Sequence, residues 1–126
     1  MKLLLDTHVV LWQLGGQRRL GETATAAIAA ADELAFSAVS FAEIGVKAGV
    51  GKLVVPDDLD VHVADAGIRT LPLTAAHALA VAELPFHHRD PFDRLLIAQA
   101  RAEGCTLVTA DARIRAYDVA VLDPLA

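Results

Sequence analysis

The sequence predicts an α/β fold with a central, mostly parallel sheet, and two features of the chain carry this prediction. Short apolar runs such as 2–5 and 105–108 have the length and composition of strands that are buried on both faces. Between such runs lie segments with helical spacing, so that strands and helices alternate. The length of 126 residues fits one compact domain over 1–126.

The first half of the chain predicts two strands and three helices. Strands are expected at 2–5 and 33–36 because both runs are short and apolar. The expected helices cover 7–14, 21–31 and a segment that continues to about Val50. Ser40-x-x-Glu43 matches a capping box and is expected to begin that third helix.

The second half predicts four more helices and three more strands. The expected helices are 57–67, 74–82 capped by Thr74, a long one that ends near Gly104, and 111–116. The expected strands are 69–71, 105–108 and 119–122. Pro91 suits the first position of the long helix, because its missing N–H would be unpaired there anyway. Asp90 is then the N-cap, and Asp93 lies in the first turn, where the helix dipole favours negative charge.

Composition narrows the class of protein. No apolar run is long enough to span a bilayer, and Asp6 interrupts the N-terminal run too early for a signal peptide, so a cytoplasmic protein is expected. Cys105 is the single cysteine, which excludes an intrachain disulfide and indicates a buried structural thiol. The net charge of −5 argues against a broad basic surface for nucleic acid, but it leaves room for an enzyme with an acidic metal site.

Four carboxylates from separate segments are expected at one edge of the sheet. Asp6 and Asp111 each follow a predicted strand, and Glu43 and Asp93 lie in first turns of predicted helices. Ligands of such sheets bind outside the carboxyl ends of the strands. Each carboxylate taken singly also fits a helix cap, but a cluster of carboxylates is costly without a cation. Oxygen ligands without cysteine favour Mg²⁺ or Mn²⁺, ions that suit phosphodiester hydrolysis.

Several segments, taken together, resemble a known family over essentially the whole chain. They are Leu3-Leu4-Leu5-Asp6-Thr7-His8, Ser40-x-x-Glu43-Ile44 followed by Gly51-Lys52-Leu53, His88-Arg89-Asp90-Pro91-Phe92-Asp93-Arg94-Leu95-Leu96-Ile97-Ala98-Gln99-Ala100, and Leu107-Val108-Thr109-Ala110-Asp111. The chain resembles PIN-domain proteins, and among them the VapC-type toxin ribonucleases of type II toxin–antitoxin modules. The resemblance implies a three-layer α/β/α domain that hydrolyses RNA phosphodiester bonds with Mg²⁺, for which Mn²⁺ can substitute.

The resemblance also implies roles for residues and partners. Asp6, Glu43, Asp93 and Asp111 would be the catalytic, metal-holding acids. Accessory positions around them would be Asp90, Thr7 and Thr109. The expected partners are an RNA substrate, a VapB-like antitoxin and a second copy of the chain in a homodimer. An amphipathic helix or an extended segment of the antitoxin would dock beside the apolar helix 7–14, with an arginine or lysine inserted among the acids. The apolar residues of this helix equally fit a helix that is buried on most sides.

Other polar residues keep two interpretations open. The arginines expected either to contact RNA phosphates or to be surface charges and local ion pairs are Arg18, Arg19, Arg89, Arg94 and Arg113. The histidines His8, His87 and His88 are expected at the surface or hydrogen-bonded around the site. Trp12 is expected in core or interface packing.

Two other functions compete with the toxin. One is a PIN nuclease of RNA maturation without an antitoxin, and the other is a catalytically silent PIN scaffold, which the intact set of acids disfavours. A dehalogenase-type phosphatase is disfavoured because Asp6-Thr7-His8 lacks the second aspartate of its D-x-D motif.

Overall fold

The strands form one parallel sheet with the first strand in the middle. A computed structural model describes residues 1–126. The sheet has the order β3-β2-β1-β4-β5, and every neighbouring pair is parallel. The strands are β1 (Lys2–Leu5), β2 (Glu33–Ser37), β3 (Arg69–Leu71), β4 (Thr106–Val108) and β5 (Val121–Leu122). The predicted parallel α/β fold is confirmed.

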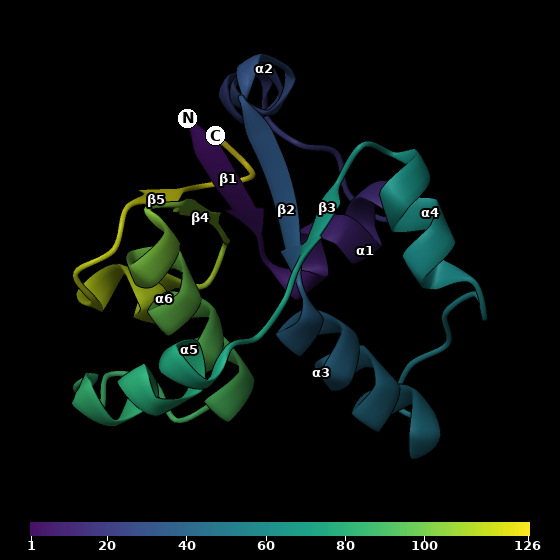
Figure 1. The fold of residues 1–126 in the computed structure, drawn as a ribbon. Coiled ribbons are helices and arrows are strands. Elements are labelled where there is room, and N and C mark those ends of the chain that lie inside the picture. Colours follow the sequence, from purple (N-terminus) through teal and green to yellow (C-terminus); the bar gives the residue numbers. More distant parts are fainter.

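Helices cover both faces of this sheet. They are α1 (Thr7–Gly15), α2 (Glu22–Ala30), α3 (Ala38–Gly49), α4 (Leu59–Asp65), α5 (Ala75–Ala80) and α6 (Pro91–Glu103), with short 3₁₀ helices η1 (Val81–Glu83) and η2 (Ala112–Ala116). Figure 1 shows α5 and α6 on one side of the sheet and α1 and α4 on the other, with both chain termini at the same end. No helix is both long enough and apolar enough to cross a membrane.

Alternation along β1 divides the core into two halves. Leu4 is fully buried against one face, together with Leu96 and Ile97 of α6. Leu3 and Leu5 point to the opposite face, where Val9 and Val10 of α1 and Val63 of α4 are buried. Because both faces of the strand are covered, its sequence is a continuous apolar run rather than an alternating one. The three layers follow from this pattern.

The strand order creates a crevice at the carboxyl ends of β1 and β4. The chain runs from β1 outward through β2 and β3, and then returns to add β4 and β5 on the other side of β1. Such a reversal is the usual position of a ligand site in open parallel sheets. The N–H of Asp6 donates to the Val108 carbonyl at 2.9 Å, which continues the pairing of these strands. The residues that follow the two strands therefore meet at this edge.

The start of α3 differs from the prediction. The helix begins at Ala38, because Ser37 at the end of β2 is its N-cap and accepts a hydrogen bond from the Val39 N–H at 2.9 Å. Ser40 is fully buried inside the helix. The predicted Ser40–Glu43 capping box is therefore wrong. The predicted cap at Thr74 is confirmed, and its hydroxyl accepts from the His77 N–H at 3.1 Å.

Arg94 has a structural position that the sequence did not indicate. Only 5% of the residue is exposed. Its guanidinium donates to the carbonyls of Pro85 at 2.8 Å, Val81 at 3.2 Å and Leu84 at 3.3 Å. It also donates to the Tyr117 hydroxyl at 3.2 Å. These donors are used inside the protein, so the prediction that Arg94 contacts RNA is wrong. Arg94 fastens the segment before α6 to that helix.

We expect the substitution Arg94→Met to lower the free energy of unfolding by at least about 2 kcal/mol, because it leaves several partly buried carbonyls without donors. Urea unfolding followed by circular dichroism measures this change. The matched control is Arg89→Met at an exposed position, for which a change within about 0.5 kcal/mol is expected. Equal stabilities of the two variants would contradict the structural role of Arg94.

Candidate metal centre

Asp6 presents a buried carboxylate oxygen without a hydrogen-bond donor. The residue lies directly after β1 and is 5% exposed. Its Oδ2 accepts a hydrogen bond from the Thr109 hydroxyl at 2.8 Å, whereas its Oδ1 is buried and has no partner. Burial raises the pKa of Asp6, and the bond from Thr109 opposes that shift only partly. A buried carboxylate oxygen without a donor calls for a proton or a cation.

Asp90 and Asp93 are placed by the start of α6. The Oδ1 of Asp90 accepts hydrogen bonds from the N–H groups of Phe92 at 2.8 Å and Asp93 at 3.3 Å, which confirms Asp90 as the N-cap. Burial raises the pKa of Asp93 to about 7, and the charges of Asp6, Asp90 and Glu43 add to the shift. These carboxylates therefore act on one another electrostatically across several elements.

Asp111 and Thr109 follow β4 and connect to the same edge. The Thr109 hydroxyl donates to Asp6 and accepts from the Asp111 N–H at 3.1 Å, so one side chain links two of the acids. The Oδ1 of Asp111 accepts from the Arg113 N–H at 2.9 Å. Burial alone would raise the pKa of Asp111, but hydrogen bonds from Arg113 and His88 outweigh burial and hold it below its usual range. Arg113 thus forms a local ion pair with Asp111. The sequence alone left both an ion pair and a contact with RNA open for this arginine.

Glu43 enters the site from α3 with both oxygens bonded. It is 2% exposed, and its Oε1 lies 2.8 Å from the Thr7 hydroxyl at the start of α1. The Thr7 hydroxyl is also 2.8 Å from Ser40 Oγ, which explains why that serine is buried. Lys47, one turn further along α3, donates to Glu43 Oε2 at 2.7 Å. This bond, together with the charges of Glu43, Asp90 and Asp93, raises the pKa of Lys47, so its ammonium faces the acidic cluster.

His88 is buried between two of the acids. Its Nε2 lies 2.8 Å from Asp93 Oδ2 and 2.9 Å from Asp111 Oδ2, and the three potential ligand atoms are all within 4.8 Å of one another. The sequence left two positions open for the histidines, the surface or the surroundings of the site. His88 lies at the site, whereas His8 and His87 are exposed. One feature of the sequence could have indicated the backbone contact of His88. It lies two residues before the N-cap Asp90, where a side chain can bond the backbone at the start of the helix.

The remaining arginines have no contact with the acidic cluster that would assign them a role. Arg18, Arg19 and Arg89 are exposed. The guanidinium of Arg18 is stacked 4.9 Å from the centre of the Trp12 ring, and both side chains line a pocket that contains none of the acidic residues. A role of these three arginines in RNA binding remains a prediction.

The arrangement fits a divalent cation. Asp6 offers an unpaired oxygen, and the ionised form of Asp93 is disfavoured by the neighbouring carboxylates unless positive charge is added. The donors from Asp6, Glu43, Asp93 and Asp111 are all carboxylate oxygens, which match Mg²⁺ and Mn²⁺ rather than zinc.

Fold and site together define an α/β protein with an acidic centre at the switch point of a parallel sheet. The PIN-domain family profile matches residues 3–120. The chain belongs to the PIN-domain family. It is 36% identical to Ribonuclease VapC22 of Mycobacterium tuberculosis over 118 residues, which are 91% of each chain.

Solved structures of other proteins share the fold. VapBC2 from Rickettsia felis, bound to a DNA fragment from its promoter, matches with a TM-score of 0.73 and 18% identity over 97% of this chain and 98% of that chain. FitAcB from Neisseria gonorrhoeae matches with a TM-score of 0.64 and 26% identity over 97% of both chains. The resemblance to PIN-domain proteins of the VapC type is confirmed.

The raised pKa of Asp93 predicts how stability depends on pH when EDTA removes metal. Between the ordinary value of 3.8 and about 7, the folded chain holds a proton that the unfolded chain has lost. The free energy of unfolding therefore falls as pH rises through this interval and levels off above it. Mg²⁺ restores stability more at pH above 7 than at pH 5, because a cation needs the ionised carboxylate.

Urea unfolding of the wild type and of Asp93→Asn across this pH range isolates the effect. The substitution removes the titrating carboxyl, so its pH profile should be flatter than that of the wild type. If the free energy of unfolding changed with pH in the same way for both proteins, the raised pKa of Asp93 would be contradicted.

Proposed function

We propose that this protein is a Mg²⁺-dependent endoribonuclease and the toxin of a type II toxin–antitoxin pair. The observation that carries the proposal is the unpaired buried oxygen of Asp6 within a cluster of acids at the switch point of the sheet. The relative named as a ribonuclease supports the nuclease activity, and the fold shared with a solved toxin–antitoxin complex from Klebsiella pneumoniae supports the toxin.

In this proposal Asp6, Asp93, Asp111 and Glu43 hold the ion, which is Mg²⁺ with Mn²⁺ as a substitute. When bound, the ion polarises a phosphate oxygen and makes water a stronger nucleophile at neutral pH. The chain itself supplies orientation: Thr109 fixes the rotation of the Asp6 carboxylate, and Thr7 does the same for Glu43. Asp90 caps α6 and so sets the position of Asp93.

The substitution Asp93→Asn tests the metal role against a purely structural one. The amide keeps the size of the side chain but removes the charge that would bind the ion, so we expect RNA cleavage to fall at least about 100-fold. Because burial and neighbouring charges disfavour the ionised carboxylate, the metal-free variant should be no less stable than the wild type. Cleavage of a structured RNA with Mg²⁺, Mn²⁺ or EDTA is measured alongside thermal unfolding of the same samples.

A control variant is Asp65→Asn on the exposed part of α4, for which full cleavage is expected. Cleavage that persists in EDTA, or wild-type cleavage by Asp93→Asn, would refute the mechanism.

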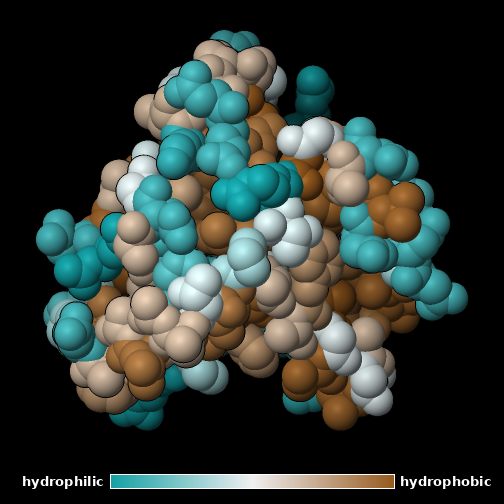
Figure 2. Space-filling view, viewed as in Figure 1, coloured by the Kyte–Doolittle hydropathy of each residue, from teal (hydrophilic) through white to brown (hydrophobic).

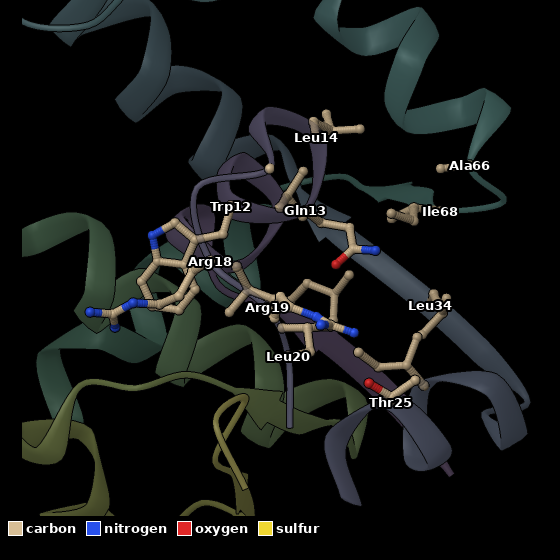
Figure 3. A pocket seen from close by; sticks show the side chains of 15 residues that line it. Trp12, Gln13, Leu14, Arg18, Arg19, Leu20, Thr25, Leu34, Ala66 and Ile68 are labelled. Atoms are coloured by element: carbon tan, nitrogen blue, oxygen red, sulfur yellow. The ribbon is translucent and has the colours of Figure 1, made fainter. Parts of the chain in front are cut away.

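We further propose that a VapB-like antitoxin docks in an apolar pocket beside α1. The pocket has a volume of about 420 Å³. Its lining comprises Leu5, Val9, Val10, Trp12, Gln13, Leu14, Gly16, Arg18, Arg19, Leu20, Thr25, Ile28, Leu34, Ala66 and Ile68. Figure 3 shows Trp12 and Arg18 side by side at one edge of the pocket and Leu34 and Ile68 at the opposite edge. An amphipathic segment with apolar residues and an acidic flank fits this lining.

The substitution Leu14→Asp tests the docking site. Leu14 is 44% exposed, so the fold should tolerate the change, while loss of apolar contact and a buried charge should weaken the complex at least about tenfold. The protein is co-expressed with the product of the neighbouring upstream gene, and the co-purified complex is quantified. The control Val61→Asp on α4 is 50% exposed, lies outside the pocket and should leave the complex intact.

Complex formation unaffected by Leu14→Asp would contradict the docking site. An RNA-cleaving protein that neither arrests growth when expressed alone nor forms any complex would instead favour a maturation nuclease.

We also propose that residues 1–126 form a single domain that acts in the cytoplasm as a homodimer. Exposed apolar side chains on α3, at its C-cap and on α5 support a contact between copies. Val46 is 57% exposed, Val50 66% and Leu79 76%. In Figure 2, apolar surface gathers over the lower part of the molecule, where α3 and α5 lie.

A further inference from the structure

The hydrogen bonds of the His88 ring fix its tautomer. The N–H of Asp90 donates to His88 Nδ1 at 3.2 Å. An imidazole nitrogen that accepts a hydrogen bond carries a lone pair and no proton, so the single proton of the neutral ring is on Nε2. That nitrogen lies 2.8 Å from Asp93 Oδ2 and 2.9 Å from Asp111 Oδ2. Only the contact with Asp111 has the geometry of a hydrogen bond, so the Nε2–H group donates to Asp111 and lies beside Asp93.

A nitrogen in this state cannot bind a metal ion. Coordination requires the lone pair of a deprotonated nitrogen, and in His88 one nitrogen is protonated while the other is occupied by the Asp90 N–H. Proximity alone would group His88 with Asp93 and Asp111 as three metal ligands. The hydrogen-bond pattern instead makes His88 the donor to the Asp111 carboxylate, with Asp93 beside it.

The backbone around His88 is held from a different part of the chain. Tyr117 follows η2 and is 5% exposed. Its hydroxyl oxygen accepts hydrogen bonds from the N–H groups of His87 at 3.1 Å and His88 at 2.9 Å. Arg94 donates to the same oxygen at 3.2 Å. The ring is therefore fixed at its backbone and at both nitrogens.

We propose that His88 is a positioning residue whose Nε2–H holds Asp111 in place beside Asp93, and that it is not a ligand of the metal ion. The donor stabilises the Asp111 carboxylate next to Asp93 and fixes its rotation, as groups that orient metal ligands do. This inference rests on the proposed metal site, and it assigns to His88 a role distinct from that of the acids.

Nitrogen NMR of the full-length protein with ¹⁵N-labelled histidine tests the tautomer directly. In EDTA, we expect His88 in the Nε2–H form, and we expect the proton to stay on Nε2 when Mg²⁺ is added to saturation. A proton on Nδ1 in the metal-free protein, or loss of the Nε2 proton on addition of Mg²⁺, would overturn the proposal.

Two substitutions of His88 separate a donor from a ligand. The amide nitrogen of His88→Gln reaches approximately the position of Nε2 and can donate to the carboxylates, whereas the shorter side chain of His88→Asn cannot. We expect Mn²⁺ affinity, measured by electron paramagnetic resonance, to fall about tenfold or more in His88→Asn and to be largely retained in His88→Gln. The control His62→Gln, at an exposed histidine of α4, should bind Mn²⁺ as the wild type does.

Equal losses in both His88 variants, or no loss in His88→Asn, would contradict the proposal. If His88→Asn does not fold, the tautomer measured in the wild type decides the question. Neither readout uses RNA, so a protein that fails to cleave RNA but keeps the Nε2–H tautomer and the expected Mn²⁺ affinities would count against the proposed function alone.

Discussion

Electrostatic repulsion among buried carboxylates is the constraint on which the rest of this structure depends. Burial and neighbouring charge raise the pKa values of Asp6 and Asp93, so ionised acids at this edge oppose folding. The chain offsets part of this cost with hydrogen-bond donors. Thr109 donates to Asp6, Thr7 and Lys47 to Glu43, and Arg113 and His88 to Asp111. The Nε2 of His88 also lies 2.8 Å from Asp93 Oδ2. One oxygen of Asp6 still has no donor, and a bound cation would offset the electrostatic cost that remains.

The same constraint explains why the acids come from separate elements. Neighbouring carboxylates on one helix would repel one another without enclosing a volume. Here the acids come from the ends of β1 and β4, from the second turn of α3 and from the start of α6. The N-terminus of α6 adds favourable interaction with negative charge at Asp90 and Asp93. The reversal of strand order at β1, between β1 and β4, leaves a crevice at this edge.

The positions of the acids at strand ends and at a helix start could be predicted from the sequence, because these positions depend on local rules. Asp6 and Asp111 follow apolar strand runs, and Pro91 identifies the start of the helix that carries Asp93. Prediction failed for Ser40, where two serines fit the same helix start and only the end of β2 decides between them. It also failed for Arg94, because its burial depends on carbonyls that the fold brings together. The environment of His88 depends on Asp111 and Tyr117, which are distant in sequence, and no local pattern reveals that contact.

Helix α1 joins the acidic edge to the apolar pocket. Thr7 at its start bonds Glu43, and Trp12 and Leu14 near its end line the pocket. A helix of this length, nine residues, spans about 13 Å. An extended segment of about four residues covers that distance. A partner anchored in the pocket therefore needs only a short continuation to bring a basic side chain to the carboxylates, where charge-assisted hydrogen bonds would hold it in place of the cation. If the partner docks as proposed, docking and inhibition would reside in one short stretch of it, and the length of α1 would set the spacing between the apolar anchor and the basic residue of that stretch.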